Sequence, residues 1–498
     1  MRFGFETGQW MGRRLAVLIG LAALTMLAGC ADFDTQGRRG PSSLAVPTIP
    51  AEAPRTTGVE TPQMAEHLRL VEMFGGEYRW PAAERHLNAI LSKLAAASDK
   101  PGEAYKVTLL NTPLVNAFAL PTGNLYVTRG LLALANDSSE IAAVMAHEIG
   151  HVTAGHASQR EEHEKQQLLL SKVSNVLQSH ERGEQVQALG TASLASFSRQ
   201  QEFDADQIGV KTIARAGFDP YGASRFLTSL GRSTVLRATL FGQRPSERGD
   251  VMSSHPSTPE RIARAISVAR QIGAPGIGEA GREDYLSAID GIEFGDNPTE
   301  GVIRGRQFSH PRLGFAITAP DGFVLENTSQ AVLGIARGGA EAMRLDSVSV
   351  SGDTPLEAYL NSGWIEGLQQ ASVRTLTVNG LPAATATARS GEWRFRLAAL
   401  RLGTDVYRII FATRNLDDET DRRFQTAIES FRRLATEEVP RLRPLHVSLV
   451  TASDGDTAET VSARSPLADR PLEYFLMLNG LDRAGPLKSG QRYKLVVE

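Results

Sequence analysis

The sequence predicts a multidomain protein, in which a mainly α-helical domain with a small sheet is followed by an α+β domain and then by a small βααβ domain. The chain has 498 residues, and its 42% apolar and 22% charged residues are typical of folded proteins. Apolar residues recur with helical spacing in residues 138–156 and 198–217, whereas stretches between residues 308 and 413 alternate as strands do. Two helix-like segments between two strand-like segments end the chain.

The N-terminal segment differs in composition from the rest of the chain. Two arginines precede an apolar run at residues 15–27, which is shorter than the roughly 20 residues that a helix needs to cross a bilayer. This pattern is typical of a secretory signal peptide, which we expect at residues 1–29. The run ends in LAGC, residues 27–30, which resembles the lipobox of bacterial lipoproteins. The resemblance implies that cleavage exposes Cys30 for acylation; an incidental free thiol is the alternative.

These features predict where the mature protein resides. Lipid on Cys30 would anchor it to a membrane, with the rest of the chain in the periplasm. Alanine rather than aspartate follows this cysteine, which favours the outer membrane under the sorting rule of enteric bacteria. Prolines, serines, threonines and small residues then dominate without periodicity, so we expect residues 30–61 to form a flexible tether.

A histidine-rich run, MAHEIGHVTAGHA at residues 145–157, carries the strongest chemical signal. Asp137 followed by Glu140 is a capping pattern, so we expect a helix from near Ser138 through His156. On a straight helix His156 would point away from the histidine five residues before it, and we expect a structural or surface role for it.

The first part of this run is an H-E-x-x-H motif. His147 and His151 lie four residues apart, so both imidazoles can reach one ion from the same helix face. Glu148 is near enough to contact a water molecule on the metal without being a ligand. The motif alone does not establish a metal site, because it also occurs by chance.

Zinc catalysis needs three protein ligands and one open position, so another ligand must come from elsewhere in the chain. The best candidate is Glu202 in SRQQEFDADQIGV, residues 198–210. Glu202 and Asp206 are again four residues apart on a predicted helix. One carboxylate can bind zinc while the other accepts a hydrogen bond from a ligand histidine. By itself such an acidic pair is more often a solvated helix face, and the H-E-x-x-H motif reverses that preference.

Three separated motifs now resemble a known family. They are NAFALPTGNLYVTRGLL (116–132), SEIAAVMAHEIGH (139–151) and EFDAD (202–206), in the order strand, helix, helix. Together they resemble the HtpX/BepA-like zinc endopeptidases, relatives of the CAAX prenyl endopeptidases, over about residues 62–271. The resemblance implies a zincin-type (gluzincin) peptidase domain with one Zn²⁺ per chain. The implied roles are zinc ligands for His147, His151 and Glu202, general base for Glu148, and hydrogen-bond partner of a ligand for Asp206.

The resemblance extends to two further elements. SSHPSTPERIARA, residues 253–265, is similar to a family segment in which a histidine before proline approaches the zinc, so His255 is a candidate auxiliary or latent ligand. Its alternative role is structural, because a predicted helix start follows it. The family also implies that substrate backbone pairs with an edge strand, for which we expect Asn116, Ala117 and Phe118.

The periodicity breaks after the peptidase region. We expect a connector at residues 272–303 and an α+β domain at residues 304–436, built of period-two strands and closed by a helix at 417–434. No chemistry is assigned to this domain, and His310 within it is expected to have a local structural role.

The tail resembles a LysM module over residues 445–497. The shared features are Gly-Asp-Thr (455–457) at a helix start, Leu-Asn-Gly-Leu (478–481) after a second helix, and Gly-Gln (490–491) before a final strand. A helix cap and a turn explain the same residues structurally. The resemblance implies a βααβ fold and contact with peptidoglycan.

Three functions remain open at this point. We expect a lipid-anchored periplasmic zinc endopeptidase that acts on misassembled or damaged envelope proteins. A peptidoglycan cross-link endopeptidase is the second reading, motivated by the LysM-like tail. A non-catalytic chaperone or wall-attached scaffold is the third, and the four intact metal-site residues argue against it. A formal net charge of -3 gives no sign of a nucleic-acid partner.

Overall fold

The computed structural model describes residues 61–160, 162, 180–240, 242, 255, 257–328, 331–336, 338–467 and 469–498, and only the backbone of residues 180–197. The predicted signal peptide, Cys30 and the tether up to residue 60 lie outside these ranges. The described residues form two compact units. Pro298–Leu442 makes one unit together with Thr239, Leu240 and Gly242, and the other unit joins the remaining described residues up to Asn297 to Arg443–Glu498.

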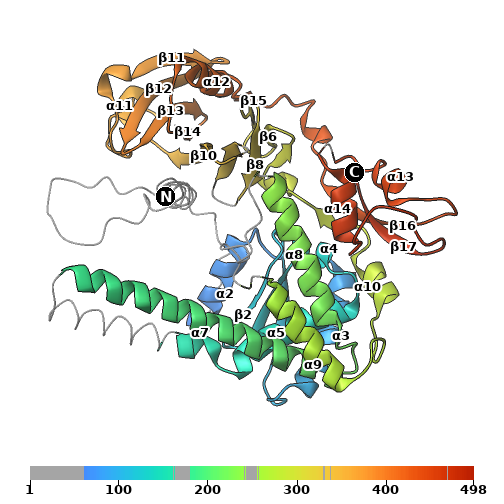
Figure 1. The fold of residues 1–498 in the computed structure, drawn as a ribbon. Helices are drawn as coiled ribbons and strands as arrows, with labels where there is room; N and C mark the ends of the chain where they lie inside the picture. Colours follow the sequence, from blue (N-terminus) through green and yellow to red (C-terminus); the bar gives the residue numbers. More distant parts are fainter. Residues whose placement is uncertain are drawn as a thin grey trace, which may run out of the picture. The chain divides into compact units, whose positions relative to one another are not determined.

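The unit with the H-E-x-x-H motif is rich in helices, as predicted (Figure 1). These are α2 (Pro62–Met73), α3 (Pro81–Ala97), α4 (Arg129–Leu134), α5 (Ser138–Thr153), α7 (His180–Arg215), α8 (Gly222–Leu240), α9 (Pro259–Ile272) and α10 (Arg282–Ile289). A small sheet has the order β1-β3-β2, with β1 (Lys106–Leu110), β2 (Ala117–Ala119) and β3 (Asn124–Thr128). β1 runs parallel to β3, and β2 pairs with β3 in antiparallel fashion.

Helix α5 begins where the sequence predicts and ends earlier. The Asp137 carboxylate accepts a hydrogen bond from Glu140 N at 2.9 Å, which caps the first turn. The prediction that the helix continues through His156 is wrong, because α5 ends at Thr153. Gly155 follows with a φ of 68°, a left-handed conformation that turns the chain before residues 156–160 become helical again.

The C-terminal residues have the predicted βααβ order. The elements are β16 (Leu445–Thr451), α13 (Ala458–Ser462), α14 (Pro471–Leu478) and β17 (Arg492–Val497), and β16 and β17 pair in antiparallel fashion. Thr457 forms a capping box with Thr460 at the start of α13. A short strand, β4 (Glu293–Phe294), adds to the other edge of β16, so the three-stranded sheet β17-β16-β4 combines the C-terminal module with the predicted connector.

A buried lysine strengthens this attachment. Lys494 on β17 is 0% exposed, and its ammonium donates to the carbonyl oxygens of Ala133, Leu134 and Ala135 at 2.7, 3.1 and 2.7 Å. These carbonyls end helix α4, where a helix leaves acceptors without intrahelical partners and where positive charge is favoured. The module therefore satisfies the end of the helix that precedes α5.

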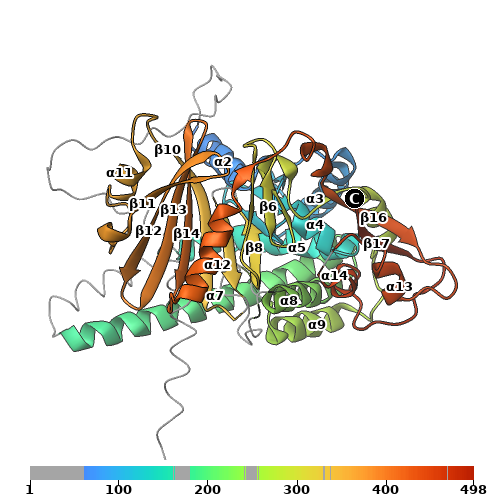
Figure 2. The ribbon, with the colours of Figure 1, turned by 90° about the horizontal axis from the view of Figure 1, so that it is seen from above.

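The unit Pro298–Leu442 is rich in strands, as the α+β prediction expects. A seven-stranded sheet has the order β11-β12-β13-β14-β10-β9-β8, and a four-stranded sheet has the order β15-β7-β6-β5 (Figure 2). The strands are β5 (Val302–Arg304), β6 (Gln307–His310), β7 (Phe315–Thr318), β8 (Phe323–Asn327), β9 (Val332–Ala336), β10 (Glu341–Ser349), β11 (Arg374–Val378), β12 (Leu381–Ser390), β13 (Trp393–Leu402), β14 (Asp405–Thr413) and β15 (Arg432–Arg433). Helices α11 (Leu356–Leu360) and α12 (Asp418–Glu429) accompany them. The prediction of a helix to residue 434 is wrong, because β15 pairs with β7 there.

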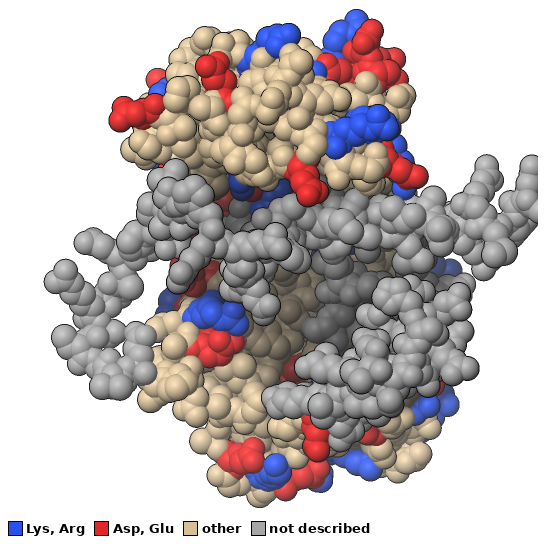
Figure 3. All heavy atoms as spheres, turned by 90° about the vertical axis from the view of Figure 1, so that its left-hand side faces the viewer, with Lys and Arg blue, Asp and Glu red and all other residues tan. Residues whose placement is uncertain are grey.

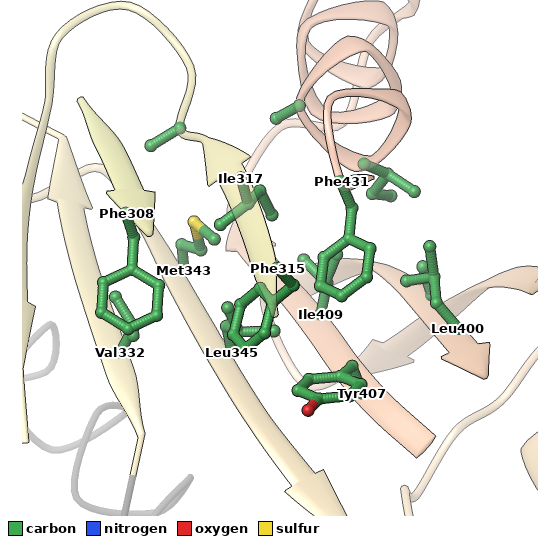
Figure 4. Packing of buried hydrophobic residues seen from close by; sticks show 14 of the residues in the cluster. Phe308, Phe315, Ile317, Val332, Met343, Leu345, Leu400, Tyr407, Ile409 and Phe431 are labelled. Carbon is green, nitrogen blue, oxygen red and sulfur yellow. The ribbon is translucent and has the colours of Figure 1, made fainter. Parts of the chain in front are cut away.

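The core of this unit is aromatic and aliphatic. Figure 4 shows Phe315 and Phe431 close to each other, and their stacked rings lie 5.0 Å apart between centroids. Phe411 and Phe424 stack at 4.5 Å, joining β14 to α12. All four rings are buried, so strands and helix share one packed interior.

Two further properties concern the charge of the surface and the polarity of the helices. On the face that Figure 3 shows, Lys and Arg side chains are interspersed with Asp and Glu on a mainly uncharged surface. Within the described ranges, every helix is too short or too polar to span a bilayer.

Candidate metal centre

Two helices bring the predicted ligands together. His147, Glu148 and His151 lie on α5, and Glu202 and Asp206 lie on α7. The two helices approach closely at glycines. A Cβ on Gly150 would lie 3.3 Å from Ala205 O, and one on Gly209 would lie 3.2 Å from His147 N. The glycine inside the H-E-x-x-H motif therefore helps α7 to reach the histidines.

The potential ligand atoms form a tight, largely buried group. His147 Nε2 lies 3.0 Å from His151 Nε2 and 3.4 Å from Glu202 Oε2. His151 Nε2 lies 3.5 Å from Glu202 Oε1. His255 joins the group, with Nδ1 3.3 Å from His147 Nε2 and 3.0 Å from both oxygens of Glu202. One atom from each of these four residues lies within 4.8 Å of the others.

This donor set fits zinc. Zinc prefers four nitrogen, sulfur or oxygen ligands in a tetrahedron, with Zn–N and Zn–O bonds of about 2.0–2.2 Å. Bonds of that length place neighbouring ligand atoms about 3.3 Å apart. The separations of 3.0–3.5 Å among His147, His151, Glu202 and His255 agree with this spacing.

In both α5 histidines, the ring nitrogen Nδ1, which is not part of the ligand group, also has a close neighbour. His147 Nδ1 lies 3.0 Å from Asp206 Oδ1, the arrangement expected for an acid that fixes a ligand's tautomer. His151 Nδ1 lies 2.9 Å from His156 Nδ1. The left-handed Gly155 turns the chain so that His156 faces back to His151 rather than away from it. His156 is thus a buried neighbour of a candidate ligand and belongs to no ligand group among the described residues.

Glu148 lies beside the ligand group. Burial raises the pKa of its carboxyl, against the lowering influence of His255 and His147. His255 Nε2 lies 3.7 Å from Glu148 Oε1. A raised pKa suits a group that must both accept and return a proton near neutral pH.

Sequence reasoning missed Arg261 on α9. This side chain is 4% exposed and donates to both oxygens of Asp206, each at 2.7 Å. Its Nη1 lies 3.0 Å from Glu202 Oε2. The only available signal was its position six residues after His255 in the same segment, which does not reveal its partners on α7.

An apolar cavity of about 70 Å³ opens next to Glu148. Besides the metal-site residues, its lining is mostly aliphatic or aromatic: Val115, Asn116, Ala117, Leu131, Ala143, Val144, Ala223, Phe226, Leu227 and Leu230. The predicted edge strand borders this cavity. β2 covers Ala117–Ala119 and, within the described ranges, pairs with β3 on one side only. Asn116 precedes the strand and bonds to Thr128 through its backbone.

The comparisons with known proteins agree with this geometry. Residues 81–269 match Peptidase family M48. The chain is 29% identical over 217 residues to the beta-barrel assembly-enhancing protease of Escherichia coli (strain K12), covering 42% of this chain and 43% of that protein. It is 32% identical over 202 residues to the mitochondrial metalloendopeptidase OMA1 of Arabidopsis thaliana, covering 39% and 38%. It is 23% identical over 257 residues to the metalloprotease LoiP of Escherichia coli (strain K12), covering 49% of this chain and 93% of that one.

The matched region spans only 43% of the beta-barrel assembly-enhancing protease. A solved structure, cyanobacterial PsbP (CyanoP) from Synechocystis sp. PCC 6803, is 14% identical to this chain with a TM-score of 0.21, and the match covers 26% of this chain and 96% of that one. Residues 81–269 contain the helices α5, α7, α8 and most of α9, with all candidate ligands. The chain therefore contains a metallopeptidase domain of peptidase family M48.

Proposed function

We propose that this chain is a zinc metalloendopeptidase that hydrolyses peptide bonds in periplasmic or outer-membrane proteins. The observation that carries the proposal is the convergence of His147, His151 and Glu202 beside the buried Glu148. The name of the beta-barrel assembly-enhancing protease supports an envelope setting, as do the predicted signal peptide and lipid on Cys30. Anchoring at the outer membrane and a role in envelope protein quality control belong to this proposal.

The residues present divide the chemistry among them. His147, His151 and Glu202 would hold one Zn²⁺, which when bound polarises a water molecule and lowers its pKa toward about 7. Glu148 accepts the proton of the attacking water and delivers it to the leaving nitrogen. Asp206 keeps His147 oriented through Nδ1. His255 would be an auxiliary or latent ligand of the same ion.

Substrate binding would use the edge strand and the cavity. An extended peptide can add to the free edge of β2 through backbone hydrogen bonds, which tolerates many sequences. The cavity then selects an apolar side chain near the cleaved bond, because aliphatic and aromatic groups line it. Ala117 lines the cavity and belongs to β2, so backbone pairing and side-chain selection occur next to each other.

The test is a substitution that spares the ligands. Glu148→Gln should retain zinc and lose about 10²–10⁴-fold in peptide hydrolysis, because the ligand set is intact and the proton acceptor is absent. The same variant, expressed in cells, should trap envelope proteins that the active enzyme cleaves. Unchanged hydrolysis by Glu148→Gln would refute the assigned role, and unchanged cellular function would favour a scaffold.

A second candidate function follows from the C-terminal module. Its βααβ order agrees with the LysM-like prediction and favours contact with peptidoglycan, whose cross-links would then be the substrate. Incubation of purified sacculi with the enzyme separates the two. Released muropeptides would support the second function, whereas intact sacculi together with cleaved envelope proteins would support the first.

A further inference from the structure

Arg261 is the one residue that contacts both α7 carboxylates of the metal centre from a third helix, among the contacts of the described residues. We propose that Arg261 is a positioning residue that sets the zinc affinity of the site by fixing Glu202 and Asp206. The inference rests on the proposed zinc function and goes beyond it, because no ligand or proton-transfer role is assigned to this arginine.

The geometry of the guanidinium supports this role. Nε and Nη2 donate to the two oxygens of Asp206 at 2.7 Å each, a fork that holds the carboxylate plane in one orientation. Nη1 lies 3.0 Å from Glu202 Oε2. Because Asp206 in turn lies 3.0 Å from His147 Nδ1, Arg261 orients one candidate ligand directly and another through Asp206.

The local sequence explains how Arg261 reaches this position. Thr258 caps α9 by accepting from Arg261 N at 3.2 Å, and Pro259 opens the helix. Arg261 shares the buried face of α9 with Ala265 and Ala269. The small alanines allow α9 to pack against α7, and the long arginine extends from this interface to the carboxylates.

The three buried carboxylates of the site also need compensating positive charge. Glu148, Glu202 and Asp206 are each under 9% exposed, so ionised forms would concentrate three negative charges in a buried volume. A zinc ion supplies two positive charges and Arg261 the third. Without the arginine, the buried site keeps an uncompensated carboxylate, which is costly in a medium of low polarity.

The test compares zinc affinity among purified full-length variants by competition with a chelator of known affinity. Arg261→Met should weaken zinc binding about 10–100-fold, the usual effect of removing the partner that orients a ligand. Arg261→Lys should fall between wild type and Arg261→Met, because an ammonium keeps the charge and loses the fork. Co²⁺ substituted for zinc should show altered absorption bands in Arg261→Met, because these bands report ligand geometry.

Arg264→Met is the matched control. Arg264 lies on the same helix and also contacts α7, with its guanidinium 3.7 Å from the Phe203 ring centre, but its ion pair is with the exposed Glu260. It should bind zinc within about twofold of wild type and leave the Co²⁺ bands unchanged. Equal losses in Arg264→Met and Arg261→Met would reduce Arg261 to a helix-packing role and overturn the inference.

The experiment distinguishes a variant that fails to fold from a failure of the proposed function or of the inference. If Arg261→Met does not fold, Arg261→Lys carries the test, and wild-type zinc affinity and wild-type Co²⁺ bands in that variant overturn the inference. Wild-type protein that binds no stoichiometric zinc would instead overturn the proposed function. Zinc-binding wild type with equally tight Arg261 variants would leave the proposed function standing and overturn only the inference.

Discussion

Replacement of Lys494 by methionine tests whether the C-terminal module stabilises the peptidase unit. The ammonium donates to three carbonyl oxygens at the end of α4. One of them, Leu134 O, also accepts from Asn136 Nδ2 at 3.1 Å. The variant therefore takes the ammonium donor from Ala133 O and Ala135 O, which belong to residues at most 2% exposed.

The magnitude follows from these two carbonyls. Each buried acceptor that loses its partner costs about 1–3 kcal/mol, so the gross loss is about 2–6 kcal/mol. Methionine also removes the cost of burying an ammonium, a cost that lowers the pKa of Lys494 and that the nearby Glu140 partly offsets. After this offset we expect Lys494→Met to reduce the free energy of unfolding by about 1–4 kcal/mol.

The assay is denaturant unfolding of the full-length protein at pH 7, combined with hydrogen exchange of the amides between α4 and α5. Lys488→Met is the control, because Lys488 is an exposed lysine of the same module and should stay within about 0.5 kcal/mol of wild type. Faster exchange should appear near residues 131–137 in Lys494→Met alone. Equal unfolding midpoints for the two variants would refute the stabilising role of the ammonium.

Two further predictions concern pH and packing. Burial, with a smaller contribution from Arg312, lowers the pKa of His310 to about 4 from 6.5, so between these values the unfolded chain binds a proton that the native protein does not. Stability of the unit Pro298–Leu442 should therefore rise with pH from 4 to 6.5 by about 3 kcal/mol, measured through the fluorescence of its tryptophans. His310→Asn should flatten this profile, and an unchanged slope would contradict the assignment. In α8, Gly222→Ala should destabilise the fold by about 1–3 kcal/mol, because its Cβ would lie 2.5 Å from Ser139 O. Gly231→Ala should be neutral or stabilising by up to about 1 kcal/mol, because its Cβ would lie no closer than 3.5 Å to Ser257. Similar thermal shifts in both variants would refute the steric argument.

The metal motifs could be predicted because their information is local. His147, Glu148 and His151 share one helix face through the period of 3.6 residues, and Glu202 and Asp206 do the same on α7. The start of α5 could also be predicted from the sequence, because Asp137 caps the helix by a hydrogen bond to a residue only three positions away. Their assignment as one site still rested on resemblance to a family rather than on periodicity.

Features that depend on the direction of the backbone after a turn, or on packing between distant segments, could not be predicted from the sequence. A straight helix would point His156 away from His151, and one left-handed glycine, Gly155, reverses that expectation. Arg261 looked like an ordinary helix residue, since its partners lie 55 and 59 positions away in the chain.

The sequence by itself determined the helices that carry the metal motifs, the strand-rich character of residues 304–436 and the residue types that can bind a metal, because all three depend on spacing along a regular backbone. Only the tertiary structure decided which charged groups neutralise one another and which module is part of which unit. Lys494 shows the reason most clearly. A lysine in the last strand gives no local sign of burial, and only the packed fold brings it to the end of a helix some 360 residues earlier.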